Sequence, residues 1–553
     1  MRSVSNNYNR RATPINSRMI TSENTKPKFR VGLLLDSPRI TKYVVDFVKR
    51  VQSHDALELS CVFLIAPNKI GESSRSPVAN LLLNFILAIE RIFLLKNKRH
   101  NNHLQMFDLS SVLPNTNVQP LNDDDIQPVA APDLDLLIAL SPTAPLHLRN
   151  AAKLGVVTIS HSIEFINGDG LAGFWEVYFR RDVSSFSVKR FTKTSGTGDS
   201  LLRGQVGTQF YYLLNQATLF EKSSYYLFKV VESIASAGEV PTPEPNYPVC
   251  FIPRSTPSAL EAIYYLIGLV RLVTGKLLEN ARGYKYRWNV GFLLTDWRNA
   301  NLCRASIIEN PAGRFLADPF ALSRNGRNYC FAEDIDCSGN RGKIAAYSLE
   351  ADRATFLGVA LEENFHLSYP YLFQYQGELY MCPETSESRE IRIYKCIDFP
   401  LRWKLAKVIM KNVSAVDTML FERNGVWWML TNVDPANWGD HSLELCIFSA
   451  KSPLDEAWAS HPGNPFFIDA LRARNGGMIR EGDKIFRVAQ AQGFDTYGKR
   501  TTVHQIVELD DQIYVEQCVY EILPSFKRGI VATHHLHSVG DITVLDFARD
   551  GHS

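Results

Sequence analysis

The sequence predicts two folded parts, an α/β domain with a parallel sheet and, after it, an all-β propeller. The propeller prediction rests on one pattern: an apolar run, a polar turn ending in Gly, and a second run rich in aromatic and β-branched residues. The pattern occurs four times, with turn glycines at Gly326, Gly377, Gly425 and Gly482, so that the steps are 51, 48 and 57 residues. A hairpin that recurs at about 40–60 residues is typical of propeller blades. The α/β prediction rests on near-continuous apolar strands that alternate with helical periodicity.

Length and composition indicate a multidomain globular protein. The chain has 553 residues, 45% of them hydrophobic and 21% charged, which is enough for about two to four domains. A net charge of +2 makes no electrostatic case for nucleic acid as a partner. The nine cysteines are scattered without a CxxC pair, which favours reduced thiols in a cytoplasmic protein. Residues 1–28 are polar and basic, and we expect a disordered tail there.

The α/β domain is predicted over residues 29–235. Four apolar runs read as buried strands: residues 29–36, 57–66, 133–140 and 155–162. Residues 40–51 have helical periodicity between the first two. Ligands of parallel sheets bind beyond the carboxyl ends of the strands, and His161 lies at the end of the fourth run. His161 is therefore the first candidate for chemistry in this domain.

Residues 236–282 are expected to form a Pro-rich linker followed by an amphipathic helix, and a second such helix is expected at residues 78–95. Each apolar stretch carries charged residues and falls short of the roughly 20 charge-free residues of a spanning helix. We expect two amphipathic helices packed between the domains. Peripheral membrane contact through residues 78–99 or 259–278 is the alternative, because Lys96, Lys98 and Arg99 follow the first helix.

Residues 29–234 resemble the formyltransferase fold. The resemblance is carried by DLDLLIAL, GVVTISHS and a T-G-D-x-L turn at Thr197–Leu201. It implies an Asn, a His and an Asp that act on an amine and a formyl group from a folate carrier. Here the His is His161, but Ile159 and Gly196 occupy the Asn and Asp positions. Losing one oxyanion donor costs about two to three orders of magnitude, so the usual formyl transfer and a folate carrier are not expected. Another small ligand near His161, Glu164 and Asp169 stays open.

Aligning the four repeats on their turn glycine produces two polar columns. Eight positions upstream lie Asp318, Tyr369, Asp417 and Arg474. Seven positions downstream lie Glu333, Glu384, Asn432 and, with a shift, Gln490. The innermost strands of a propeller line its central channel, so each column can become a ring of side chains. Converging carboxylates raise one another's pKa values, which separates an acid from a base.

The propeller sequence resembles two known groups. Asp318-Pro319 is similar to the base motif of five-bladed propeller glycosidases, but Tyr369 stands at the modulator position and Asp417 at the acid position. ADPF, FHLSYPYLFQYQGELYMCPETSE and VDTMLF together resemble the N-terminal propeller domain of plant glucosamine inositolphosphorylceramide transferases. This second resemblance covers about residues 286–523. It implies a five-bladed propeller over residues 283–553 and a link to glycan or glycolipid assembly, without the catalytic glycosyltransferase domain.

Three further features have two interpretations each. His366 could point into the funnel or stabilise a turn. Trp438, in the loop at residues 432–441, could stack on a sugar or anchor the loop. The segment THHLH at residues 533–537 resembles a metal cluster, but we expect it to be a closing strand of the last blade, and no metal is predicted.

Two functions are compatible with these patterns. The first is a carbohydrate-active enzyme, a transferase more than a glycoside hydrolase, with Asp318, Glu384 and Asp417 as acid, base and modulator and Glu333 beside them. Its ligand would be a sugar, an oligosaccharide or a nucleotide sugar, bound by Tyr369, Arg474, His366, Trp438 and Asn432. The second is a non-catalytic glycan-binding or scaffolding protein. A formyl or acyl transferase using His161 on an amino sugar is a further alternative. Carboxyl groups about 5–10 Å apart would favour the enzyme; burial of Asp318 and Asp417 in ion pairs with arginines would exclude it.

Overall fold

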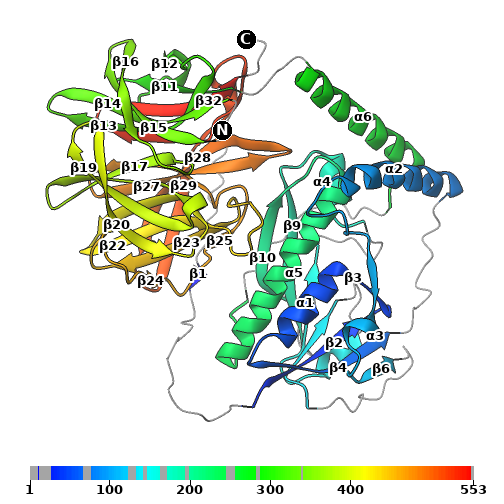
Figure 1. The fold of residues 1–553 in the computed structure, drawn as a ribbon. Coiled ribbons are helices and arrows are strands. Elements are labelled where there is room, and N and C mark those ends of the chain that lie inside the picture. The colour runs from blue at the N-terminus through cyan, green and yellow to red at the C-terminus, as the bar shows by residue number, and fades with distance from the viewer. Residues whose placement is uncertain are drawn as a thin grey trace. The chain divides into compact units, whose positions relative to one another are not determined.

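A computed structural model describes residues 10–11, 27–65, 76–121, 133–140, 146–161, 171–192, 198–243, 256–281, 287–337 and 341–549. The chain divides into two compact units (Figure 1). One unit comprises residues 15–276, and the other comprises residues 277–553 together with residues 1–14.

The first unit is built on a seven-stranded sheet in the order β10-β9-β8-β7-β2-β4-β6. Its strands are β2 (Phe29–Leu35), β4 (Leu57–Ile65), β6 (Val118–Leu121), β7 (Leu136–Ala139), β8 (Val156–Ser160), β9 (Val183–Phe191) and β10 (Asp199–Gly207). The four predicted strands all form, and each pairs in parallel with its neighbours among them. Strands β9 and β10 extend the sheet in antiparallel pairing. The short strands β3 (Arg39–Thr41) and β5 (Met106–Asp108) pair separately.

Helices cover the sheet because both of its faces are apolar. Helices α1 (Lys42–Gln52) and α5 (Tyr212–Ala237) pack on one face, where Phe47, Val48 and Leu227 are buried. Leu148 and Ala152, in and after the 3-10 turn η1 (Leu146–Asn150), lie in the cluster on the other face. The remaining helices of this unit are α2 (Pro77–Leu95), α3 (Leu109–Val112), α4 (Phe174–Tyr178) and α6 (Ala259–Ala281).

The second unit is a five-bladed propeller. Three blades are separate antiparallel sheets: β13 (Arg314–Arg324) to β16 (Arg353–Leu361), β17 (Ser368–Tyr375) to β20 (Arg402–Lys411), and β21 (Ala415–Arg423) to β24 (Ala459–Ser460). The middle strands of these blades are β14 (Arg327–Asp336), β15 (Gly342–Glu350), β18 (Glu378–Glu384), β19 (Glu390–Asp398), β22 (Val426–Val433) and β23 (Glu444–Ala450), which also pairs with β25 (Phe467–Ile468). The fourth blade runs β26 (Asn475–Glu481), β27 (Lys484–Gly493), β28 (Thr496–Leu509) and β29 (Ile513–Ile522), with β1 (Arg10–Arg11) on its edge.

The fifth blade combines strands from both ends of the propeller sequence. Strands β31 (Leu536–Val539) and β32 (Ile542–Arg549) pair with β11 (Arg287–Leu293) and β12 (Ser306–Ile308), and β30 (Ile530–Ala532) joins β32. The first strands of the blades, β13, β17, β21, β26 and β31, contact one another in a closed ring. This ring is the wall of the central funnel.

Turn chemistry explains why the hairpins recur. In three blades the two turn residues both have positive φ: Asn325 and Gly326, Gln376 and Gly377, and Asn424 and Gly425. Such turns match the twist of the flanking strands and favour Asn-Gly. In the fourth blade Gly482 (φ 56°) is instead the first turn residue, followed by Asp483. The fourth repeat is therefore out of step with a glycine-based alignment.

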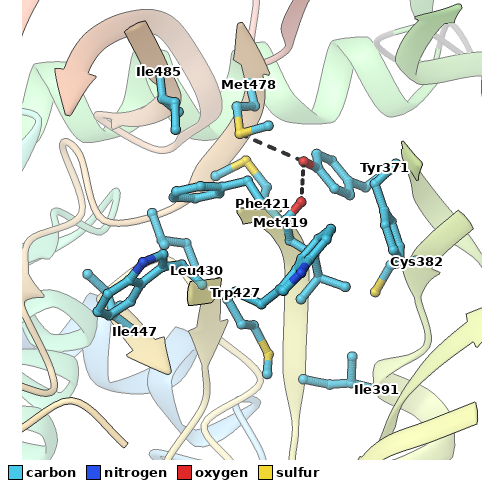
Figure 2. Close-up of a cluster of buried hydrophobic side chains, with 14 of the residues drawn as sticks. Tyr371, Cys382, Ile391, Met419, Phe421, Trp427, Leu430, Ile447, Met478 and Ile485 are labelled. Carbon is cyan, nitrogen blue, oxygen red and sulfur yellow. Dashed lines mark hydrogen bonds between the residues drawn. The ribbon is translucent and has the colours of Figure 1, made fainter. Parts of the chain in front are cut away.

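Aromatic and sulfur-containing side chains fill the space between neighbouring blades. Figure 2 shows one such cluster, in which Met419 and Phe421 lie beside Met478 of the next blade, while the Trp427 ring packs on Phe373 and Tyr375 of the preceding blade. The Tyr371 hydroxyl donates to the Leu420 carbonyl at 2.7 Å, so this phenol is both buried and satisfied. Blades cannot bury these faces alone, which is why the ring stabilises all of them together.

Candidate functional site

The first polar column coincides with a β-bulge that three blades share. Asp318, Tyr369 and Asp417 have φ values of 48°, 48° and 51°, in the left-handed region. In each blade the register shifts at this residue, so that two residues oppose one on the next strand. A bulge of this kind re-aims a side chain and is frequent beside active sites. The sequence alignment of these three residues therefore corresponds to a real structural equivalence.

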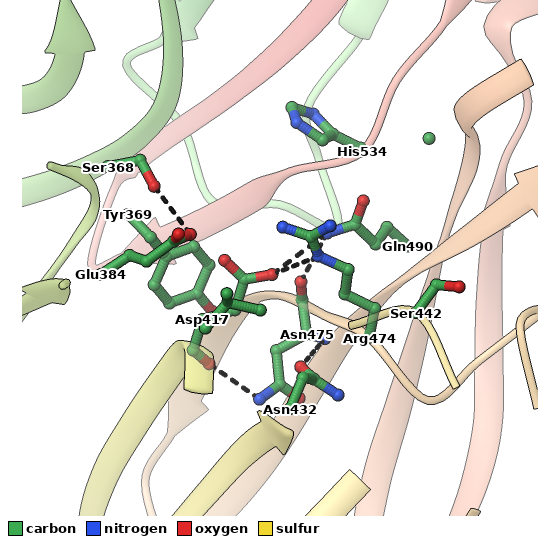
Figure 3. Close-up of polar contacts among 12 residues, drawn as sticks. Ser368, Tyr369, Glu384, Asp417, Asn432, Ser442, Arg474, Asn475, Gln490 and His534 are labelled. Atoms are coloured by element: carbon green, nitrogen blue, oxygen red, sulfur yellow. Dashed lines mark hydrogen bonds and ion pairs between the residues drawn. The ribbon is translucent and has the colours of Figure 1, made fainter. Parts of the chain in front are cut away.

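The fourth blade departs from the predicted column. Its bulge lies at Gly476 and Gly477, between the pairs Asn475↔Ala489 and Met478↔Arg487. Arg474 precedes the bulge and is not equivalent to Asp318, and Ala489, not Gln490, is equivalent to Glu333. Two differences are the cause: Gly482 is the first turn residue, and the arm between bulge and turn is one residue shorter, Met478–Glu481 against Phe320–Arg324. Both side chains nevertheless reach the site (Figure 3).

Arg474 and Gln490 converge on Asp417. Arg474 Nε lies 2.7 Å from Asp417 Oδ2, and Gln490 Nε2 donates to the same oxygen at 3.3 Å. The Asp417 side chain is only 2% exposed. Burial raises the pKa of Asp417 to about 7, and Glu384 and Asp318 act in the same direction against Arg474. One half of the condition that would exclude an enzyme is thereby met, because Asp417 is buried in an ion pair with Arg474, and this pairing counts against a catalytic role for Asp417.

Asp318 lies in a different environment, next to two histidines, and no arginine of the described part of the chain forms an ion pair with it. Its Oδ1 is 3.7 Å from His534 Nε2 and 3.6 Å from His535 Nδ1. Burial would raise the pKa of Asp318, but His535, His534 and Arg474 outweigh it and lower the pKa to about 2. Asp318 is therefore an ionised carboxylate at neutral pH.

Asp318, His534 and Asp546 are close enough to hold a metal ion, but the donor set does not suit one. Asp546 accepts bonds from the backbone N–H groups of His534, His535 and Asp318 and from His534 Nδ1. These donors occupy the lone pairs that a cation would need. Although burial lowers the pKa of His534, Asp546 and Asp318 raise it overall, which suits an imidazolium between two carboxylates. The predicted closing strand here is β31, which begins just after His535.

Glu333 and Glu384 hold equivalent positions on the second strands, opposite Ala317 and Ser368. His366 Nδ1 accepts from the Gly342 N–H at 3.0 Å, so its Nε2 carries the proton that faces Glu333 Oε1 at 3.3 Å. Burial raises the pKa of Glu333 to about 7, helped by Asp318 and Glu384 and opposed by His366. Glu384 accepts bonds from the hydroxyls of Ser368 and Ser386. Glu333 is the carboxyl group best suited to exchange a proton near neutral pH.

Two predicted binding residues have mainly structural contacts. Asn432 donates to the carbonyls of Glu444 and Ala473 and accepts from the Asn475 N–H, so its buried amide links two blades. Trp438 lies in a loop that Asp434 organises by accepting from the N–H groups of Trp438 and Gly439. The Tyr369 hydroxyl accepts from the Gly477 N–H at 3.0 Å and so connects the ring across its centre.

Sequence reasoning missed an aromatic surface beside Asp318. Trp288 stacks on His534 with ring centroids 4.0 Å apart, and Tyr497 lies 5.3 Å from the same ring. Arg474 lies 5.2 Å over the Tyr497 ring. Trp288 precedes the first repeat, and Tyr497 follows the fourth hairpin, so neither falls in an alignable column. An aromatic face next to an ionised carboxylate suits the apolar face of a sugar.

In the first unit, His161 lies directly after β8, as its place in the sequence predicts. Its Nε2 is 2.9 Å from Ser223 Oγ, its ring packs on Phe220, and burial lowers its pKa to about 4. The expected partners Glu164 and Asp169, and Gly196 at the Asp position, lie outside the described residues.

Comparisons with known proteins concern the propeller. Residues 297–538 match the family model described as glucosamine inositolphosphorylceramide transferase 1, N-terminal. Proteins named glucosamine inositolphosphorylceramide transferase 1 are 34% identical over 251 residues in Oryza sativa subsp. japonica and 35% over 221 residues in Arabidopsis thaliana. These matches cover 42% and 39% of this chain but 33% and 28% of the relatives. The chain thus spans about a third of the length of the curated relatives that it matches.

Solved structures give only remote similarity. The catalytic domain of a family-62 α-L-arabinofuranosidase from Coprinopsis cinerea is 13% identical with a TM-score of 0.32, covering 48% of this chain and 98% of the enzyme. A family-117 glycoside hydrolase from Zobellia galactanivorans is 12% identical with a TM-score of 0.31, covering 42% of this chain and 75% of the hydrolase. Similarity at this level leaves the chemistry of the present chain open.

Proposed function

We propose that the propeller funnel binds the sugar portion of a glycan or glycolipid and takes part in glycosyl transfer. The observation that carries the proposal is the difference between two neighbouring carboxyl groups. The pKa of Asp318 is lowered to about 2, whereas that of Glu333 is raised to about 7. Groups whose environments push their pKa values apart are suited to divided acid and base roles.

In the proposed step, protonated Glu333 gives its proton to the oxygen that leaves the anomeric carbon. The Asp318 carboxylate stabilises the positive charge that develops on the sugar ring as that C–O bond breaks. The acceptor hydroxyl then forms the new C–O bond and returns a proton to Glu333. His534 and His535 hold the Asp318 carboxylate and His366 holds Glu333, while Asp417 holds Arg474 in the wall of the funnel. This assignment moves Asp417 from chemistry to positioning.

The similarity to the plant transferases supports a glycolipid as the acceptor class. Those relatives are named for inositolphosphorylceramide, a lipid with a phosphorylated polyol head. A nucleotide sugar as donor and peripheral membrane contact through residues 78–99 or 259–278 belong to the same proposal. Formyl transfer is not part of it, because Ile159 cannot supply the Asn donor that the formyltransferase pattern uses.

The test is a comparison of binding and turnover. A thermal-shift screen with nucleotide sugars, oligosaccharides and inositol-phosphate glycolipids identifies a ligand, and transfer is then assayed with that ligand. We expect Glu333→Gln to retain binding and to lose most turnover. A wild-type protein that binds the ligand but transfers nothing would instead favour the non-catalytic glycan-binding alternative. The buried Asp417–Arg474 pair is the observation that supports this alternative.

A further inference from the structure

Helix α2 has an inverted distribution of polarity. The residues that it exposes are mostly apolar and follow helical spacing: Val78, Leu81, Phe85, Ala88, Ile92 and Leu95, with the exposed Asn84 and Arg91 along one side of this stripe. Leu81 is 72% exposed and Phe85 is 55% exposed. The one acidic residue of the helix, Glu90, is instead fully buried. A helix on the surface of a globular protein normally shows the opposite arrangement.

Helix α6 has the same arrangement. Its exposed stripe contains Leu260, Ile263, Tyr264, Ile267, Val270 and Leu277, whereas Ala262, Tyr265 and Leu269 are buried. Leu260 is 67% exposed and Tyr264 is 64% exposed. Exposed apolar residues in a contiguous stripe indicate an interaction surface, in contrast to single apolar residues scattered over a protein.

A buried polar junction fixes the two helices to each other and to α5. Glu90 of α2 accepts a bond from the Tyr265 hydroxyl of α6. It also accepts from the backbone N–H groups of Tyr212 and Leu213, at 3.3 and 2.8 Å. These N–H groups begin α5, where the first turn has no intrahelical acceptor and the helix dipole favours an anion. Figure 1 shows α2 and α6 meeting near the start of α5.

The buried junction at Glu90 determines whether α2 can span a membrane or can only lie along its surface. Among the described residues, α2 is the helix with the length and hydropathy of a membrane span, with a mean hydropathy of 1.9 in its most apolar window. A spanning orientation would expose Glu90 to lipid and leave the first turn of α5 unsatisfied. With Glu90 in place, the helix can only lie along a surface and present its stripe outward.

The charges beside the two apolar stripes indicate what kind of partner surface the stripes contact. Arg91, Lys96 and Lys98 are exposed at the end of α2, and Arg271 is exposed on α6. Glu261 at the start of α6 is engaged with the Ser258 N–H and hydroxyl. Cationic residues next to an apolar helical stripe match the anionic headgroups and acyl chains of a bilayer. A second copy of this chain would bring the same positive charges together in a two-fold contact.

We propose that α2 and α6 form a platform that docks the protein on an anionic lipid bilayer, with the stripes of Leu81, Phe85 and Ile267 entering the interface. The inference develops the membrane contact of the proposed function. Its readout is vesicle binding, which needs no glycosyl transfer, so either proposal can fail alone.

The experiment is co-sedimentation of the full chain with phosphatidylcholine vesicles that contain or lack phosphatidylglycerol. We expect binding to the anionic vesicles and much weaker binding to the neutral ones. Phe85→Glu should reduce binding about tenfold or more, since the variant loses the burial of a Phe side chain and brings a negative charge to an anionic surface. Phe356→Glu is the matched control, because Phe356 is 54% exposed on a propeller strand. It should leave vesicle binding unchanged.

Lys96→Glu with Lys98→Glu should weaken binding to the anionic vesicles and leave the neutral ones unaffected. Three outcomes would overturn the proposal. The wild-type chain could fail to sediment with either kind of vesicle. Phe85→Glu and Phe356→Glu could behave alike. Light scattering could reveal a dimer that Phe85→Glu dissociates, in which case the stripes bind a second copy. Unfolding curves of the variants would verify that these surface changes leave the fold intact.

Discussion

At the residue scale, the funnel concentrates backbone strain where its carboxylates meet. Asp318, Tyr369 and Asp417 all adopt the left-handed conformation, which costs roughly 1–3 kcal/mol for a residue other than Gly. Asp tolerates this conformation better than Tyr does, so Tyr369 is the costlier of the three. Tyr369 is also the one whose hydroxyl bonds across the ring to Gly477. Strain retained in three equivalent positions is consistent with residues kept for what their side chains do.

The first prediction concerns the coupling between Asp318 and Glu333. The charge of Asp318 helps to raise the pKa of Glu333, so Asp318→Asn should lower that pKa. Because the proposed step needs Glu333 protonated, wild-type turnover should fall as the pH rises through about 7. In Asp318→Asn the fall should move to lower pH, and turnover at the plateau should also drop. The pH profile of kcat/KM measures both effects.

An alkaline limb at the same pH in both proteins would contradict the coupling between the two carboxyl groups. Glu333→Gln serves as the control, since it should lower turnover by about two to four orders of magnitude, and any limb that remains near pH 7 then belongs to Asp417, whose pKa is also raised to about 7.

The second prediction concerns the aromatic surface at Trp288 and Tyr497. Tyr497→Ala should weaken binding of the sugar ligand about five- to tenfold, as expected for about 1 kcal/mol of lost aromatic contact. Tyr520→Ala removes a ring of similar exposure, 52% against 46%, from an outer strand. Isothermal titration should show no loss of affinity for that control. Equal affinities for both variants would remove Tyr497 from the binding surface.

Sequence could locate part of this site and not the rest. Asp318, Tyr369 and Asp417 were predictable because equal distance from a turn glycine reflects equal position on a strand. Arg474 was placed in that column wrongly, since its hairpin has Gly at the other turn position and an arm that is one residue shorter. Trp288 and His534 come from opposite ends of the propeller sequence and meet only when the last blade closes. No local sequence pattern indicates that these two residues are in contact.

At the scale of single elements, the periodicity of the sequence predicted that a helix forms but not which of its residues are buried. The apolar run at residues 78–95 is a helix, α2, as expected. Its pattern could not reveal that Glu90 faces inward, because that orientation depends on Tyr265 and on the start of α5. A charged residue in an apolar helix suggests an exposed face from sequence alone. Here the exposed face is mainly apolar, and Arg91 lies along one side of it.

The third prediction uses Glu90 to test this junction. Burial raises the pKa of Glu90 from its ordinary value of 4.5 to about 7, against the bonds from Tyr265, Leu213 and Tyr212. Between these pH values the folded protein holds a proton that the unfolded chain has released, so stability falls as the pH rises through this window. The total is about 3 kcal/mol at about 1.4 kcal/mol per pKa unit. Glu90→Gln should flatten this part of the pH dependence.

Unfolding midpoints of the unit formed by residues 15–276, measured from pH 4.5 to pH 8, would check the expectation. Burial also raises the pKa of Glu176 in this unit, but Glu176 is present in both proteins, so the difference between them reports Glu90 alone. Parallel curves for the wild type and Glu90→Gln would mean that Glu90 does not titrate in this window.

At the scale of the whole molecule, the funnel depends on closure of the blade ring. Strand β32 pairs with β11 over seven residue pairs, joining residues 287–293 to residues 543–549. The same closure delivers His534, His535 and Asp546 to Asp318. The repeat predicted four blades directly, whereas the fifth has no repeat of its own and was predicted from the resemblance to five-bladed propellers. Closure of the blade ring therefore both stabilises the propeller and assembles the carboxylate site.

The fourth prediction follows from that dependence. Deleting residues 530–553 removes β30, β31 and β32, which leaves β11 and β12 without their partner and exposes the inner edges of β13 and β26. An open ring loses the packing that each blade needs, so the cooperative unfolding of the propeller should disappear while that of residues 15–276 persists. Deleting only residues 550–553 should preserve both transitions, since β32 ends at Arg549. Calorimetry resolves the two. A propeller transition that survived the longer deletion would show that four blades suffice, and the carboxylate site would then have to be independent of the segment between β30 and β31 that carries His534.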